Sequence, residues 1–269
     1  MTIPPGDRIL AWYFARGWRG FRTLHRWSRK FGAPSKIRHR TSYGSIFALD
    51  PGAYIDGIVL REGYYESEVL EALRPWLGTG AVFWDIGGNF GLHSVTAKCL
   101  HPTAQVFTFE PNPVMWDEVT ANAALNDVRL TVLPWALAEA SGPRTFHVND
   151  HGNSGMSTLV KWDGGHYDRA ITVECRRADQ LVATGQVPAP TVIKLDVEGG
   201  EPGVLAGLGA LLRDPGLRAI VFEAGADLGA KPDSDPIAGP LRAAGFRFAP
   251  LARREQSRHP LDNYFATRG

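Results

Sequence analysis

Acidic residues follow four apolar stretches of the sequence, and each stretch has the length and composition of a buried strand. They are Asp85, Glu110, Asp196 and Glu223. The carboxyl ends of parallel strands meet along one edge of an open α/β sheet, where such sheets bind their ligands. A carboxylate at that edge can hold hydroxyl groups of a ligand or accept a proton during a reaction. Because the pattern occurs four times, it favours a shared ligand site over four unrelated helix caps.

The stretch Asp85-Ile86-Gly87-Gly88-Asn89-Phe90-Gly91 follows the first of these strands and precedes a helical pattern. Glycines allow left-handed turns and a close approach of a ligand to the backbone, and a helix amino terminus binds anionic groups such as a carboxylate. A dinucleotide site requires Gly-x-Gly-x-x-Gly, whereas Asn89 stands at the middle glycine here. An acid two residues before the first glycine suits the ammonium group of an amino-acid ligand. An ordinary strand-to-helix turn remains the alternative for this stretch alone.

Glu110 lies 25 residues after Asp85, which is one strand–helix unit along the chain. In nucleotide-binding sheets, an acid at the tip of the second strand binds ribose hydroxyls about 20 residues after the glycine turn. Pro111 and Asn112 come next, and Asn112 is a favourable cap for the following helix. The alternative role of Glu110 is to cap that helix. Ala136, at the end of the next apolar stretch, is expected beside an adenine.

Five apolar stretches alternate with helical patterns, which is typical of a doubly wound, mostly parallel, Rossmann-like α/β sheet. The predicted strands are 82–87, 105–110, 128–137, 191–197 and 219–223, and the predicted helices are 66–77, 90–100, 113–125, 203–212 and 236–244. Further strands are expected at 144–148 and 171–175, in a hairpin of 45–49 with 54–60, and in a closing pair of 246–251 with 263–267. The polar, glycine-rich stretch 151–158 is expected to form a lid or a binding loop.

The size and composition fit one globular α/β domain with an addition: 269 residues, 44% hydrophobic and 21% charged. The two cysteines, Cys99 and Cys175, provide neither a disulfide framework nor a metal-binding spacing. The expected location is therefore the cytoplasm. No apolar run approaches the roughly 20 residues that a membrane-spanning helix needs.

The first 40 residues are strongly basic, with ten Lys and Arg against one acidic residue, and the rest of the chain carries a charge of −8. A single amphipathic helix is predicted over 8–31, with Trp and Phe on one face and Arg on the other. Such a helix suits the surface of a membrane. It equally suits packing on its own domain or on a second copy of the chain, whereas no base-reading motif supports nucleic acid. We therefore expect an N-terminal helical extension over 1–42 and an α/β domain over 43–269.

Three stretches together resemble the FkbM-type family of class I S-adenosylmethionine-dependent methyltransferases. They are Phe83-Trp84-Asp85-Ile86-Gly87-Gly88-Asn89-Phe90-Gly91, Phe109-Glu110-Pro111-Asn112 and Ile193-Lys194-Leu195-Asp196-Val197-Glu198-Gly199-Gly200-Glu201. Residues 153–158 also resemble the glycine-serine loop of that family. The resemblance covers roughly residues 60–225 and leaves out the N-terminal helix. Members commonly have Ala where Gly88 and Gly200 stand here.

The resemblance implies transfer of a methyl group from S-adenosylmethionine, most often to an oxygen of a sugar or a natural product. The acceptor would be a small molecule or a glycan. Asp196 and Glu198 would face the methyl group and the acceptor. The residues expected to bind the cofactor are Asp85, Gly87, Gly88, Asn89, Phe90, Gly91, Glu110, Pro111, Asn112, Ala136 and Asp196.

A hydroxyl nucleophile must lose its proton, and a carboxylate or an imidazole within hydrogen-bond reach can take it. The candidates are Glu198, Asp196 and His93. Glu198 is favoured, Asp196 is shared between cofactor and acceptor, and His93 is equally well explained as a packing residue. A divalent metal between Asp196 and Glu223 is conceivable, since Mg²⁺ prefers oxygen ligands. Without a third ligand in the sequence, a metal is not predicted.

Two other classes of function share parts of this pattern. A nicotinamide-dependent oxidoreductase has the same sheet and the same ribose-binding acid, but Asn89 replaces a glycine that it needs. A non-catalytic partner protein, brought to membranes by a basic helix, has no use for charged residues at the strand ends. A likeness of fold alone does not decide among these functions.

Overall fold

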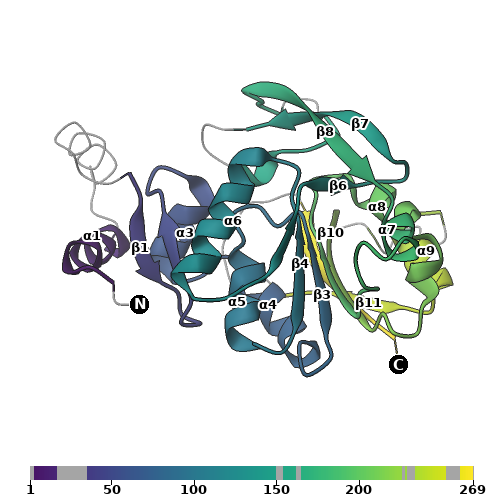
Figure 1. Cartoon of the computed structure of the whole chain (residues 1–269), viewed down its shortest axis with the longest axis horizontal. Coiled ribbons are helices and arrows are strands. Elements are labelled where there is room, and N and C mark those ends of the chain that lie inside the picture. The colour runs from purple at the N-terminus through teal and green to yellow at the C-terminus, as the bar shows by residue number, and fades with distance from the viewer. Residues whose placement is uncertain are drawn as a thin grey trace.

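The central sheet is doubly wound and mostly parallel, as predicted. The structure is a computed structural model that describes residues 3–16, 35–149, 154–161, 165–225, 228, 234–252 and 261–268. Its seven strands follow the order β11-β12-β10-β9-β3-β4-β5 (Figure 1). Their bounds are β3 Val82–Ile86, β4 Gln105–Phe109, β5 Thr131–Leu133, β9 Val192–Leu195, β10 Ala219–Gly225, β11 Arg247–Pro250 and β12 Leu261–Thr267. Strands β3, β4, β5, β9 and β10 run parallel. β12 pairs antiparallel with β10, and β11 pairs antiparallel with β12, so β12 alone of the seven strands runs in the opposite direction.

Helices cover both faces of this sheet, so its strands read as continuous apolar runs. Figure 1 shows α4, α5 and α6 on one side and α7, α8 and α9 on the other. The buried residues form a separate group on each face of the sheet. Phe83 packs with α4 and α5, whereas Trp84 and Ile86 pack with α7, α8 and α9. The helix bounds are α4 Ser67–Leu73, α5 Leu92–Leu100, α6 Pro113–Leu125, α7 Ala178–Ala183, α8 Glu201–Leu208 and α9 Ala238–Ala243. Short 3-10 turns extend α4 to Trp76 and α8 to Arg213.

The strand predicted over 128–137 is divided between two sheets. β5 ends at Leu133, and β6 (Trp135–Leu137) joins β8 (Arg169–Arg176) and β7 (Gly142–Val148) in a separate sheet of order β6-β8-β7. Pro134 stands at the division, and proline lacks the N–H that a continuous ladder needs. The added strands expected at 144–148 and 171–175 are confirmed as parts of β7 and β8, and the closing pair is confirmed as β11 and β12.

The predicted hairpin of 45–49 with 54–60 is wrong. β2 (Ile46–Leu49) pairs antiparallel with the preceding strand β1 (Ile37–Arg40), and Tyr54–Glu62 forms helix α3. Periodicity does not separate a short buried strand from a short buried helix, and five consecutive residues of α3, from Asp56 to Leu60, are buried. Asn126 anchors the β1–β2 pair to the end of α6, since its Oδ1 accepts the backbone N–H of Ile46 at 2.7 Å.

The N-terminal helix α1 spans Pro5–Ala15 and packs against α3 and β1 (Figure 1). Ala11 and Phe14 are buried there, whereas Ile9 and Trp12 are exposed. Most of the helix predicted over 8–31 lies outside the described residues, which resume at 35. No helix among the described residues is long and apolar enough to cross a membrane. The division of the chain after residue 42 stays a prediction, and the pairing of β1 with β2 runs across it.

Candidate active site

A cavity of about 1060 Å³, open solvent at its mouth included, lies at the carboxyl ends of β3, β4 and β9. The strand order reverses between β3 and β9, and open α/β sheets bind ligands at such a switch point. We call it the switch-point cavity. Of the residues expected at the site, those that line it are Gly87, Gly88, Asn89, Phe90, His93, Glu110, Pro111, Ala136, Asp196 and Glu198. Asp85, Gly91 and Asn112 are not among its lining residues.

The glycine turn after β3 packs directly against the loop after β9. Gly87 has a φ of +81°, and a Cβ there would lie 1.8 Å from the carbonyl oxygen of Asp196. A side chain is therefore excluded both by the backbone conformation and by the close approach. A Cβ on Gly88 would meet the Cγ2 of Thr108 at 2.1 Å. The backbone N–H groups of Gly87 and Gly88 both donate to the carbonyl of Phe109, at 2.9 and 3.2 Å, so the turn is fixed to β4 as well as to β9.

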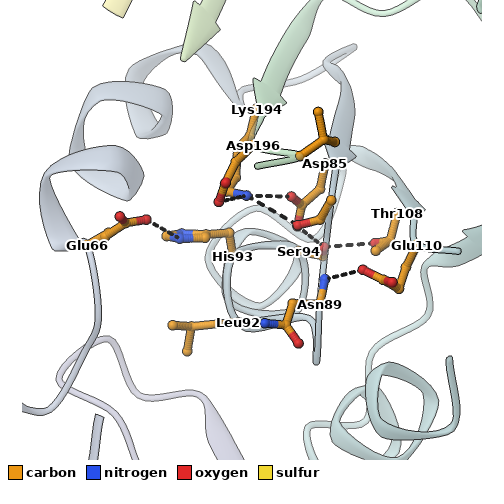
Figure 2. Close-up of polar contacts among 12 residues, drawn as sticks. Glu66, Asp85, Asn89, Leu92, His93, Ser94, Thr108, Glu110, Lys194 and Asp196 are labelled. Carbon is orange, nitrogen blue, oxygen red and sulfur yellow. Dashed lines mark hydrogen bonds and ion pairs between the residues drawn. The ribbon is translucent and has the colours of Figure 1, made fainter. Parts of the chain in front are cut away.

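The carboxylate of Glu110 links the two loops that border the cavity. Its Oε2 accepts the backbone N–H of Asn89 at 2.9 Å, and its Oε1 accepts that of Asn112 at 2.8 Å. Asn112 caps α6 as predicted, because its side chain accepts the N–H of Val114. Burial raises the pKa of Glu110 to about 7, although both backbone hydrogen bonds lower it. Figure 2 shows this carboxylate beside Asn89.

Asp85 lies behind the cavity wall and is fully buried. Its Oδ2 accepts the hydroxyl of Ser94, which in turn accepts that of Thr108 at 2.8 Å. Its Oδ1 lies 3.6 Å from the ammonium of Lys194, which also donates to Asp196 at 3.0 Å. Burial alone would lower the pKa of Lys194, but these two carboxylates raise it above its usual range. Lys194 is therefore a buried cation that joins two of the predicted strand-end acids (Figure 2).

Three carboxylates lie close together at the ends of β9 and β10. One oxygen from each of Asp196, Glu198 and Glu223 lies within 4.8 Å of the others, so the structure brings Glu198 beside the pair Asp196 and Glu223 that the sequence analysis considered for a metal. Burial and the nearby Asp196 and Glu223 raise the pKa of Glu198 to about 10. The strand predicted to run to 197 ends at Leu195, and Glu198 has a left-handed φ of 56°. A cluster of carboxylates is not by itself a metal site, and we assign no metal to it.

His93 and Glu66 form the wall opposite these acids. The Nδ1 of His93 lies 3.4 Å from the hydroxyl of Tyr64, and its Nε2 lies 4.0 Å from Glu66 Oε2 (Figure 2). Burial, and then the charge of Lys194, hold the pKa of His93 well below its usual value. Burial and Asp196 raise the pKa of Glu66 to about 8. The sequence did not indicate Glu66, because it precedes α4 in a left-handed conformation that no periodic pattern reveals.

Much of the remaining lining is apolar, and the loop before β8 borders the cavity. Phe109, Trp135, Ala136, Leu137, Phe146 and Leu159 are among the apolar lining residues. Residues 151–153 of the predicted loop lie outside the described residues, but Ser154 donates to the side chain of Asn89 at 3.0 Å. Thr158 donates to the carbonyl of Glu198 at 2.8 Å. The described part of the loop therefore contacts both the glycine turn after β3 and the loop after β9.

Comparisons with known proteins agree on one family. The family described as the methyltransferase FkbM domain matches residues 85–248. The hexuronic acid methyltransferase AglP of Haloferax volcanii is 32% identical over 169 residues, which cover 62% of this chain and 66% of that protein. The 2-O-methyltransferase NoeI of Sinorhizobium fredii is 30% identical, over 47% of this chain and 56% of NoeI. The 31-O-demethyl-FK506 methyltransferase FkbM of Streptomyces tacrolimicus is 26% identical, over 51% and 61%. In each case the match spans less than two thirds of the relative.

Proposed function

The chain belongs to the FkbM methyltransferase family, and we propose that it transfers the methyl group of S-adenosylmethionine to a hydroxyl group of a sugar or a natural product. The observation that carries the proposal is the lining of the switch-point cavity, which combines aromatic and aliphatic side chains with the carboxylates of Glu66, Asp196, Glu198 and Glu223. The aromatic and aliphatic side chains suit an adenosine, and the carboxylates suit a positively charged sulfur beside a hydroxyl. The printed names of the relatives, which include a hexuronic acid and a 2-O-methyltransferase, support the same class of acceptor.

The residues present fit the cofactor. A carboxylate has about four lone-pair positions, and backbone N–H groups use two of those on Glu110. Glu110 therefore keeps acceptor positions for the ribose hydroxyls. Ala136, Trp135 and Phe109 would enclose the adenine. The turn at 87–89 would hold the amino-acid end of the cofactor, and Asp196 would bind its ammonium group. Asp85 lies behind the cavity wall and would fix the position of Lys194.

Glu198 is the proposed general base. When bound, S-adenosylmethionine supplies a methyl group on a positively charged sulfur. In the free protein the Glu198 carboxyl is protonated at neutral pH, because its pKa is raised to about 10. A positive charge beside it lowers that pKa and releases the proton. After transfer the positive charge is gone and the pKa rises again, so the carboxylate takes the proton of the hydroxyl whose oxygen has bonded to the methyl carbon.

Positioning supplies the rest of the catalysis, since holding the hydroxyl in line with the methyl–sulfur bond removes much of the entropic cost of the reaction. The loop residues Ser154 and Thr158 would complete the wall and exclude water, because they bind Asn89 and Glu198. His93 is the second candidate for the base. It is uncharged at neutral pH and lies in the same cavity.

The N-terminal region has a proposed role of its own. We assign residues 1–42 to a unit that packs on protein, since Ala11 and Phe14 of α1 are buried against α3 and β1. Its exposed Ile9 and Trp12 would contact a second copy of the chain. The competing role is peripheral binding of the cytoplasmic protein to an anionic membrane through the basic segment. Deletion of residues 1–34, which leaves β1 paired with β2, separates the two, because loss of vesicle binding by an otherwise unchanged monomer would favour the membrane.

The test of the function is a methyl-transfer assay with a panel of neutral, amino and acidic sugars, read by mass spectrometry. We expect a product that is heavier by one methylene and an equal amount of S-adenosylhomocysteine. Glu198→Gln should retain cofactor affinity and lose at least about 10²-fold in turnover, the usual contribution of a general base. Reduction of NAD by any of these sugars, without a methylated product, would contradict the proposal.

A further inference from the structure

A second cavity adjoins the switch-point cavity and shares Glu66 with it. It lies between the turn after β1 and the connection from α3 to α4, and its volume is about 840 Å³, open solvent included. Three glutamates line it, Glu62, Glu66 and Glu68, together with Tyr43 and two serines. We call it the glutamate cavity. Glu66 lines both spaces, so the two cavities meet at its side chain.

The lining of the glutamate cavity suits a hydrogen-bond donor that carries positive charge. Its described lining residues include no Lys, Arg or His. Glu68 is only 8% exposed, and its Oε2 is buried without a hydrogen-bond partner among the described residues. A buried carboxylate oxygen without a donor is costly, and native proteins leave few such atoms unless a ligand or an ion completes them. This oxygen is the second sign, besides the charge of the cluster, that a ligand belongs there.

We propose that the glutamate cavity is an acceptor subsite that binds an ammonium group, so that the methyl acceptor is an amine-bearing sugar. The inference rests on the proposed methyl transfer and names its substrate class. An ammonium offers three N–H donors and a full charge, whereas a neutral hydroxyl offers one donor and no charge to balance the carboxylates. A uronic acid would bring a further negative charge to the cavity, which Coulomb repulsion disfavours.

The position of Glu66 explains how this subsite would act on the reaction. Its carboxylate lies 4.0 Å from His93 Nε2 and faces the acids of the switch-point cavity. An ammonium beside Glu66 would lower the pKa of this carboxyl, which burial raises to about 8, and so ionise it, and would fix the sugar ring relative to Glu198. The hydroxyl next to the amine-bearing carbon would then lie near the cluster of Asp196, Glu198 and Glu223. This placement would determine which hydroxyl of the sugar is methylated.

The experiment is a calorimetric titration of the full chain, saturated with S-adenosylhomocysteine, with three matched trisaccharides. They are β-1,4-linked triglucosamine, its fully N-acetylated counterpart, and cellotriose, which has hydroxyls in place of the amines. The pH is held below the pKa of the sugar amines. We expect triglucosamine to bind at least about 10-fold more tightly than the other two. Equal affinity for cellotriose would overturn the inference.

Two variants locate the binding. Glu68→Gln keeps the shape of the side chain and removes its charge. It should lower the affinity for triglucosamine by about 10-fold and leave the affinity for S-adenosylhomocysteine unchanged. Glu174→Gln removes one charge from β8, where Glu174 pairs with Arg176, and should change neither affinity. Circular dichroism and urea unfolding check that both variants are folded, and Glu62→Gln replaces Glu68→Gln if the latter does not fold.

The outcomes distinguish this inference from the proposed function. If S-adenosylhomocysteine binds but triglucosamine does not, the subsite is wrong and the methyl transfer stands. If S-adenosylhomocysteine itself does not bind, the proposed function fails. Displacement of triglucosamine by Mg²⁺ or Ca²⁺ alone, lost in Glu68→Gln, would make the glutamate cavity a metal site and would overturn its assignment to an amine.

Discussion

Gly87→Ala tests whether the close approach of the two loops builds the switch-point cavity. Gly80→Ala is the matched control, because Gly80 has a φ of +80° and Gly87 one of +81°, while only Gly80 has open space around a new Cβ. Each substitution places an alanine in the left-handed region, which costs about 1–2 kcal/mol. The difference between the two variants therefore isolates the contact with Asp196.

The size of that difference follows from the geometry. A new Cβ on Gly87 would lie 1.8 Å from the carbonyl oxygen of Asp196, and carbon–oxygen contacts of this kind are normally about 3.3 Å or longer. The turn and the end of β9 must separate by roughly 1.5 Å, which breaks the hydrogen bond from Asp196 N to Ile86 O, now 3.1 Å, and loosens that from Gly87 N to Phe109 O. One lost backbone bond at about 0.5–1.5 kcal/mol, with overpacking of about 1–3 kcal/mol, gives roughly 1.5–4.5 kcal/mol beyond the control.

Urea unfolding, followed by circular dichroism, measures the free energy of unfolding of both variants, and calorimetry measures their affinity for S-adenosylhomocysteine. We expect Gly80→Ala to stay within about 2 kcal/mol of the parent and to bind normally. Gly87→Ala should be less stable than the control and bind weakly wherever it is still folded. Equal stability and equal affinity of the two variants would refute the argument from the close approach.

Three further predictions concern the site and the N-terminal core. Gly88→Ala should destabilise the protein through the Cγ2 of Thr108, and adding Thr108→Ser, which removes only that methyl, should restore stability in urea unfolding; no rescue would contradict the contact. Burial raises the pKa of Asp56 to about 7, so the folded state keeps a proton that the unfolded state has already lost, and stability falls as pH rises from about 4 to 7. Asp56→Asn should remove on the order of 2–4 kcal/mol of that fall. An unchanged dependence of thermal unfolding on pH in this variant would contradict the raised pKa of Asp56. Finally, Glu198→Gln should abolish the rise of turnover with pH while His93→Gln preserves it, and the reverse result would assign the base to His93.

The meeting of the strand-end acids could be predicted from the sequence because it follows from strand order alone. Asp85, Glu110, Asp196 and Glu223 each come directly after, or at the end of, a parallel strand, and parallel strands place their ends at one edge. The pattern could not tell which of the acids reach the cavity. Asp85 is covered because Ser94 and Lys194 occupy its carboxylate, which is a matter of side-chain packing.

Other parts of the site depend on single backbone conformations. Glu66 and Glu198 enter the switch-point cavity from left-handed residues, a conformation that ordinary side chains rarely adopt and that periodicity does not encode. The sequence pattern predicts a strand where the structure has helix α3, because the buried run of this helix is short. Pro134 could have indicated the end of β5, since proline interrupts a central strand.

The most direct test of the account is a calorimetric competition between S-adenosylhomocysteine and NAD on the full chain and on Glu110→Ala. We predict one S-adenosylhomocysteine per chain, no measurable binding of NAD, and a loss of about 1.5–3 kcal/mol in the free energy of S-adenosylhomocysteine binding in the variant, the value of hydrogen bonds to a charged group. Tighter binding of NAD than of S-adenosylhomocysteine, or an unchanged affinity in folded Glu110→Ala, would contradict it.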